Sequence, residues 1–94
     1  MLNKQEALFR ANDFLREKSK EWNKEGEIRI ESEGAFTDKD SLLVCYNTIA
    51  YLDHGDELDR LAGNNPIEVN LRTGDCRILS LDETLKYMDE GFLK

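Results

Sequence analysis

Turn-forming residues on both sides of one short alternating segment constrain this chain more than any other feature of its sequence. Apolar and polar residues alternate over residues 67–71, the pattern of a strand with one buried face. Residues 63–66 (Gly-Asn-Asn-Pro) precede this strand, and residues 72–75 (Arg-Thr-Gly-Asp) follow it. Because glycine reaches positive φ and proline cannot continue regular structure, both strand ends are defined. With residues 76–79 as the returning strand, the pattern predicts a β-hairpin.

The beginning of the chain predicts a long amphipathic helix. Asn3 followed by Glu6 is a capping signal, because a short polar side chain can accept a hydrogen bond from an unpaired backbone N–H. About 20 helical residues should follow, ending at residues 24–26 (Lys-Glu-Gly). One apolar face recurs at spacings of three and four and should pack on the core: Ala7, Leu8, Ala11, Phe14, Leu15 and Trp22.

A second helix is predicted near the end of the chain. Residues 80–83 (Ser-Leu-Asp-Glu) form a capping box that should start it. A single apolar stripe follows and is expected to pack: Leu81, Leu85, Met88 and Phe92.

The middle of the chain predicts further strands. Ile28 and Ile30 alternate with charged residues, and residues 33–34 or 37–40 supply a turn, so a first antiparallel pair is expected there. Residues 41–52 have the strongest strand composition.

The side-chain parity of that strand changes within it. A change near Asn47 or Thr48 indicates a β-bulge. Beyond it, residues 53–56 predict a turn, and residues 57–62 have room for one or two helical turns before residue 63.

The order of these elements favours an α+β fold class. Strands joined by hairpins lie between two helices, without the alternation of strand and helix that builds a parallel sheet. We expect an antiparallel sheet of about four strands with the N-terminal long helix and the C-terminal helix packed on one face. At 94 residues the chain should form a single domain, residues 1–94.

The charge of the chain restricts its partners. The formal net charge is −7, which disfavours nucleic acid and anionic membranes and favours a basic protein. Residues 25–59 hold ten acidic residues and two basic ones, whereas both flanks are close to neutral. The acidity therefore belongs to the middle of the chain.

Cellular location is predicted from what the sequence lacks. The N-terminus shows no basic stretch followed by an apolar run, and the longest apolar run, residues 42–46, is too short for a bilayer. We expect a cytoplasmic protein with Cys45 and Cys76 as thiols.

Catalysis has weak support in the sequence. His54 beside Asp53 and Asp56 could perform acid-base chemistry or hold a metal, but a metal usually needs three or four convergent ligands, and a solvated turn is favoured. Cys45 with His54 could form a nucleophile and base, but Cys45 lies in an apolar run that favours an inert thiol. We expect no enzyme activity, no catalytic residue, no metal and no cofactor.

Taken by itself, the acidic middle has two interpretations. It is either a solvated face, the usual role of charge clusters, or a surface that attracts a basic target. Tyr51, next to the acidic turn, is the aromatic residue most suited to an interface.

A family resemblance favours the second interpretation. Residues 61–66 (Leu-Ala-Gly-Asn-Asn-Pro), Thr73-Gly74 and the helix around residues 7–15 resemble the YrhB-like family, also called the immunity protein 35 family. The resemblance implies an α+β immunity protein, encoded beside a polymorphic toxin, that binds and neutralises the toxin. Residues 25–40 are longer and more acidic than in compact members, which marks them as a possible specificity region.

The resulting hypothesis is a cytoplasmic immunity protein that blocks its cognate toxin by steric occlusion. The predicted toxin-binding residues are six acids and one aromatic anchor: Asp38, Asp40, Tyr51, Asp53, Asp56, Glu57 and Asp59. The alternative is a chaperone-like holdase that binds partly unfolded clients through exposed apolar surface on the sheet. A third and weaker alternative is a small enzyme centred on His54.

Overall fold

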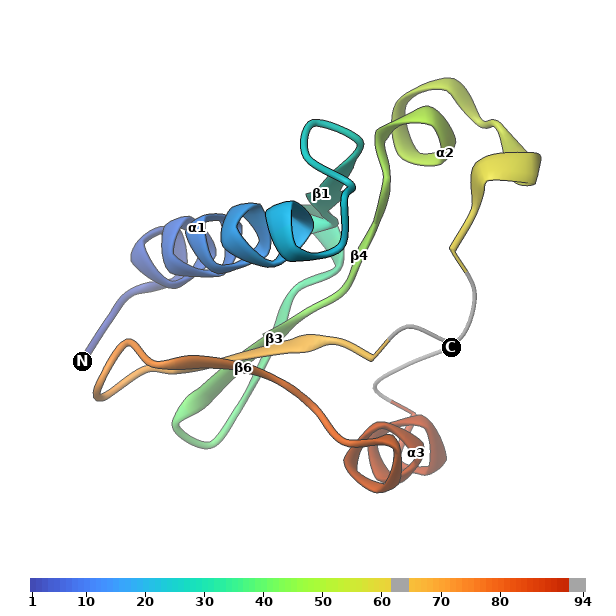
Figure 1. Cartoon of the computed structure of the whole chain (residues 1–94). Coiled ribbons are helices and arrows are strands. Elements are labelled where there is room, and N and C mark those ends of the chain that lie inside the picture. The colour runs from blue at the N-terminus through green and yellow to red at the C-terminus, as the bar shows by residue number, and fades with distance from the viewer. Residues whose placement is uncertain (62–64, 92–94) are drawn as a thin grey trace.

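The computed structural model describes residues 1–61 and 65–91 (Figure 1). Helices and strands alternate irregularly along these residues, with two one-turn 3₁₀ helices, η1 and η2. In chain order the elements are α1 (Lys4–Glu21), β1 (Ile28–Ile30), η1 (Ser32–Gly34), β2 (Phe36–Asp38), β3 (Ser41–Val44), β4 (Tyr46–Thr48), α2 (Ile49–His54), η2 (Glu57–Asp59), β5 (Ile67–Asn70), β6 (Cys76–Ile78) and α3 (Leu81–Asp89). The predicted α+β class, with a long first helix and a last helix on antiparallel strands, is confirmed.

Helix α1 begins at the predicted capping signal. The Asn3 side chain accepts a hydrogen bond from the Glu6 N–H at 2.8 Å, and the Glu6 carboxylate accepts one from the Asn3 N–H at 3.1 Å. The helix ends at Glu21, earlier than predicted, because Asn23 takes up the left-handed conformation with φ of 56°. Asparagine tolerates this conformation, so the chain turns before it reaches Gly26.

Four strands form one antiparallel sheet in the order β2-β3-β5-β6. The predicted hairpin joins β5 to β6 and is confirmed. Gly74, with φ of 81°, donates its N–H to the Asn70 carbonyl at 2.7 Å, and the Asn70 side chain accepts from the N–H groups of Arg72 and Thr73. Of the turn signal before β5, Pro66 is buried, while residues 63 and 64 lie outside the described residues.

Strand β1 does not form a hairpin with the strand that follows it in the chain. β1 forms a separate two-stranded sheet with β4, in which Ile30 lies opposite Tyr46. Residues 33–34, one of the two predicted turns, belong to η1. The second predicted turn, residues 37–40, includes the end of strand β2. Lys39, with φ of 57°, lies in the turn that joins β2 to its antiparallel partner β3.

The predicted strand over residues 41–52 is wrong in its second half. It is interrupted at Cys45 and ends at Thr48, where α2 begins. The Thr48 hydroxyl caps this helix by accepting a hydrogen bond from the Tyr51 N–H at 3.1 Å. The parity change therefore marks a helix start, and the predicted bulge near Asn47 or Thr48 is corrected to a helix cap.

The following segment agrees with the prediction more closely. Gly55, with φ of 69°, ends α2, so residues 53–56 contain the expected change of direction. The helical turns expected within residues 57–62 are reduced to η2, and residue 62 lies outside the described residues.

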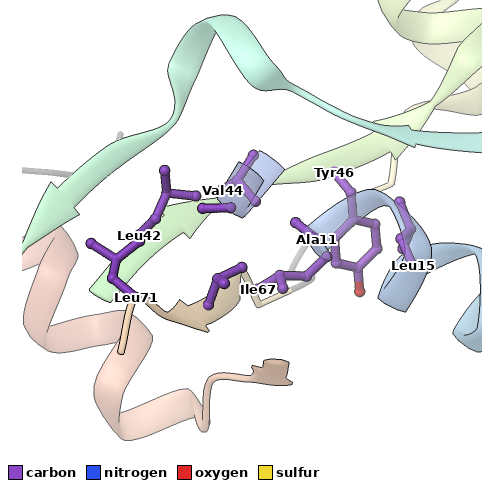
Figure 2. Close-up of a cluster of buried hydrophobic side chains, with 9 residues drawn as sticks. Ala11, Leu15, Leu42, Val44, Tyr46, Ile67 and Leu71 are labelled. Atoms are coloured by element: carbon purple, nitrogen blue, oxygen red, sulfur yellow. The ribbon is translucent and has the colours of Figure 1, made fainter. Parts of the chain in front are cut away.

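Helix α1 covers one face of the four-stranded sheet. Ala7, Ala11 and Leu15 of α1 are buried in one cluster with alternating residues of the central strands: Leu42, Val44, Ile67 and Val69. Figure 2 labels Leu42, Val44 and Ile67 together with Ala11 and Leu15. Tyr46 extends this cluster toward the end of α1, where Trp22 stacks on its ring at 5.9 Å between centroids. The core therefore lies between α1 and the sheet.

Helix α3 contacts the opposite face. Tyr87 donates its hydroxyl to Asp38 at 2.8 Å and packs edge-on against Phe36. Phe36 lies opposite Leu43 in the ladder, and Leu43 alternates with the α1-facing residues Leu42 and Val44. The helices thus lie on the two sides of the sheet (Figure 1), and our expectation of both on one face is wrong.

The apolar stripe of α3 is also oriented differently from the prediction. Leu81, Leu85 and Met88 are exposed, whereas Thr84 is buried and Tyr87 is half-buried against the sheet. Phe92 lies outside the described residues. The guanidinium of Arg77 in β6 forms an ion pair with the carboxylate of Glu83 near the start of the helix, at 2.6 Å. The Arg77–Glu83 ion pair and the contacts of Tyr87 with Phe36 and Asp38 therefore attach α3 to the sheet.

Candidate interaction surface

The seven predicted contact residues form two groups, at opposite ends of the extended stretch through β3 and β4 (Figure 1). Asp38 and Asp40 lie at the turn between β2 and β3. The second group lies on α2, on η2 and between them: Tyr51, Asp53, Asp56, Glu57 and Asp59. The stretch between the groups, residues 40–48, spans roughly 25 Å of extended chain. The seven residues therefore do not make one compact patch.

The first group is engaged within the protein. Asp38 accepts the Tyr87 hydroxyl, and this bond together with burial raises the pKa of Tyr87 to about 12, with burial the larger cause. Asp40 pairs with Arg72 of the β5–β6 turn at 2.8 Å. These two carboxylates connect the β2–β3 turn to α3 and to the hairpin.

Asp53 in the second group is also paired. Its carboxylate accepts two hydrogen bonds from Arg29 of β1, at 2.6 and 3.2 Å, and this contact lowers the pKa of Asp53. Arg29 also donates to the carbonyl of Ile30 at 2.9 Å. The pair attaches α2 to β1, so Asp53 positions the helix more than it presents charge. Sequence reasoning missed Arg29, although it is one of only two bases within residues 25–59.

The other three acids face solvent. Asp56 caps η2 by accepting the N–H of Leu58 at 3.1 Å, and its residue is exposed. Glu57 and Asp59 are exposed, and their carboxylates form no ion pair with the residues that the structure describes. Outward negative charge in this region therefore comes mainly from Glu57 and Asp59, with Asp56 beside them.

Tyr51 is covered on one side by a base from the same region. The Arg60 guanidinium lies 5.3 Å from the centroid of the Tyr51 ring, a cation–π distance. Tyr51 is half-buried, and Arg60 is exposed. Tyr51 thus supports Arg60 and has a smaller free surface than an isolated anchor would have.

A cleft of about 530 Å³ lies beside these residues. The turn at residues 24–27, the first turn of α2 and η2 form its walls. Its lining includes Lys24, Glu27, Ile49, His54, Leu58 and Asp59. We name residues 49–60 the α2–η2 surface; it provides part of the cleft wall, including Asp59, and carries the exposed acids.

Leu58 is the residue of this surface that sequence reasoning missed. Its side chain is 96% exposed, between the acids Asp56, Glu57 and Asp59. The sequence signal was a single leucine among acids, which we interpreted only as part of a short helix. An apolar side chain at full exposure within a charged turn makes no contribution to the core.

The surface has few of the requirements of an active site. His54 is exposed, and its neighbour Asp53 is paired with Arg29. Burial, followed by the charge of Glu31, raises the pKa of the Cys45 thiol, which disfavours the nucleophilic thiolate. Both cysteines are free thiols, as predicted. The arrangement fits binding better than chemistry.

Residues 1–61 and 65–91 contain no cluster of three or more histidine, cysteine or acidic side chains placed to hold a metal ion. Within the same ranges, none of the helices combines the length and the apolar composition needed to cross a bilayer.

Comparison with known proteins gives one match. The sequence model of a family described as immunity protein 35 matches residues 5–85. No curated protein and no solved structure matches the chain. The matched range begins in α1 and ends within α3, so it includes both sheets and the α2–η2 surface.

Proposed function

Because the chain belongs to the immunity protein 35 family, we propose that it binds a cognate bacterial toxin domain and neutralises it by steric occlusion. The family match is the observation that carries this proposal. The protein acts as a cytoplasmic inhibitor, needs no cofactor and catalyses no reaction. Its partner is a protein with a basic contact surface.

The α2–η2 surface is the proposed centre of contact. Glu57 and Asp59 are exposed and form no ion pair with the residues that the structure describes, and Asp56 is exposed at the start of η2. A local negative field speeds the encounter with a basic partner and fixes its orientation. Fast capture is what an inhibitor of a toxin requires, because free toxin damages the cell.

The remaining predicted contacts have supporting roles in this proposal. Asp53 holds α2 in place through Arg29, and Tyr51 supports the Arg60 guanidinium. Asp38 and Asp40, at the other end of the sheet, contribute to the long-range field and not to the contact itself. The contact is therefore smaller than the full set of seven residues.

Charge reversal tests the proposal. The probe is the toxin domain encoded beside the gene for this chain, and the variant is Glu57→Lys with Asp59→Lys. These two acids are suited to reversal because neither has an ion-pair partner among the described residues. We expect association at low ionic strength to slow by about tenfold or more, and its salt dependence to weaken.

A matched control separates position from net charge. Asp89→Lys with Glu90→Lys changes the net charge of −7 by the same amount, on the exposed end of α3. We expect this control to retain most of the association rate. Equal slowing in both variants would show that only net charge matters and would contradict a contact at the α2–η2 surface.

The structure does not support the chaperone-like alternative. It requires exposed apolar surface on the sheet, but α1 covers one face, and the other face carries α3. The central residues Leu42, Leu43 and Val69 are fully buried. We therefore do not propose a holdase.

A further inference from the structure

Leu58 is the most exposed large apolar side chain among the described residues. It is 96% exposed, compared with 67% for Phe9 on α1 and 61% for Leu81 on α3. A single exposed leucine is ordinary on a protein surface. Two further observations distinguish Leu58: the way its backbone is held and the charges around it.

The turn that carries Leu58 is fixed to β4 by hydrogen bonds. Both sets of bonds act on residues that follow Leu58. The Thr48 hydroxyl donates to the Asp59 carbonyl at 2.8 Å. The Asn47 side chain accepts from the Leu61 N–H at 2.8 Å and donates to the Leu61 carbonyl at 3.3 Å. Asn47 is only 6% exposed, so its two bonds to Leu61 are partly shielded from water, whereas the Thr48–Asp59 bond is exposed.

The start of the turn is fixed as well. Asp56 accepts the Leu58 N–H, and the Asp59 N–H donates to the Asp56 carbonyl at 3.1 Å. The backbone of Leu58 is therefore ordered before any partner arrives. Pre-ordering reduces the entropy lost on binding, which increases the affinity that an anchor side chain can give.

The charges around Leu58 specify the kind of pocket it fits. Asp56, Glu57 and Asp59 flank Leu58 along the chain, and all three are exposed. An apolar pocket with a basic rim would receive the leucine at its centre and the carboxylates at its edge. Such an arrangement, an apolar anchor within a polar rim, is the usual anatomy of a binding hot spot.

We propose that Leu58 is the anchor of the toxin interface and inserts into an apolar pocket of the toxin that is rimmed by lysine or arginine. This inference rests on the proposed function and adds the residue that supplies affinity. The acids govern the rate of association, and Leu58 governs the rate of dissociation.

Substitution of Leu58 by serine tests the anchor. With the adjacent toxin domain as the probe, we expect Leu58→Ser to weaken binding by about 30-fold or more, mainly through faster dissociation. The salt dependence of association should stay unchanged because no charge is removed. Leu58→Met, which keeps an apolar side chain of similar volume, should bind within about tenfold of the original chain.

The matched control is Leu81→Ser, which removes an exposed leucine from α3. We expect it to bind as the original chain does. Equal binding by the Leu58→Ser variant and the original chain would overturn the anchor and leave the proposed function in place. Absence of any complex between the original chain and the toxin domain would overturn both.

A photo-crosslinking residue at position 58 identifies the pocket. We expect a crosslink to an apolar residue of the toxin that has lysine or arginine neighbours. A crosslink to an acidic or uncharged surface would overturn the proposed pocket chemistry. A crosslink to a second copy of this chain would assign Leu58 to self-association and overturn the proposal.

Discussion

The α1 side of the sheet and the α2–η2 surface are held together by different forces. Between α1 and the sheet, the contacts are fully buried apolar side chains such as Leu15, Leu42 and Ile67. Within residues 49–60 no side chain is buried, and the backbone depends on polar bonds from Asn47, Thr48 and Arg29. The apolar core therefore does not depend on which side chains the α2–η2 surface presents outward. A partner-specific surface can vary on such a scaffold while the core remains constant.

The largest expected effect compares one leucine from each region. Leu42→Ala removes a fully buried side chain and should lower the free energy of unfolding by about 3 kcal/mol. Leu58→Ala, at the exposed surface, should change it by less than about 0.5 kcal/mol. Urea unfolding measures both. Similar losses in the two variants would contradict the division into a core and a surface held by polar bonds.

The second expected effect concerns the buried amide that fixes η2. Asn47→Ala removes the acceptor for the N–H groups of Thr48 and Leu61 and should lower the free energy of unfolding by about 1 to 3 kcal/mol. Hydrogen exchange should accelerate at Leu61 and Leu58 while α1 remains protected. Asn12→Ala, on the exposed side of α1, is the control. Uniform acceleration along the chain would refute a local role for Asn47.

The smallest expected effect concerns the Arg77–Glu83 ion pair, which attaches α3 to the sheet. Arg77, followed by the capping contact with Ser80, lowers the pKa of Glu83 to about 2, below its ordinary value of 4.5. A lowered pKa gives stability that is present above about pH 4.5 and is lost as the pH falls through about 2. Because the Glu83 side chain is 39% exposed, solvent screening limits the contribution to less than about 1 kcal/mol.

Glu83→Gln isolates this effect, because glutamine can keep the capping bond without the charge. We expect unfolding curves of this variant to show a smaller loss of stability between pH 4.5 and pH 2 than the original chain shows. Asp82→Asn, which removes the charge of a neighbouring exposed acid and keeps the Arg77–Glu83 ion pair, is the control. The same pH dependence with and without the Glu83 charge would refute the attachment of α3 through Arg77.

Helix caps and turns that depend on hydrogen bonds between neighbouring residues were predictable from the sequence. The capping boxes at Asn3 and Ser80 and the turn at Gly74 depend on a few adjacent residues, and all three are confirmed. Gly74 and Asn70 show why: their hydrogen bonds stay within the turn itself. No tertiary contact was needed to predict them.

Strand pairing and helix packing between distant parts of the chain were not predictable from the sequence. β1 pairs with β4 and not with the strand that follows it, and sequence alternation cannot select between these partners. Ile49 and Tyr51 favour a strand by composition, but the Thr48 cap starts a helix there. The apolar stripe of α3 indicated packing, whereas Tyr87 and Arg77 attach the helix by another face.

The charge of the candidate surface was predictable from the sequence, but its geometry was not. Counting acids marked residues 25–59 as the acidic part of the chain, yet only the structure showed that Asp53 is paired with Arg29. Leu58 was missed because a lone leucine among acids has no periodicity. Its proposed role rests on its exposure and on the hydrogen bonds that Asn47 and Thr48, from another part of the fold, make to the neighbouring backbone.

The decisive measurement is hydrogen exchange of this chain with and without one equivalent of the proposed toxin partner. We expect an inhibited 1:1 complex in which added protection is concentrated in residues 49–61. Residues 4–21 of α1 and 81–89 of α3 should exchange as in the free protein. Failure to form an inhibited complex, or protection confined to α1 or α3, would rule out toxin binding through the α2–η2 surface.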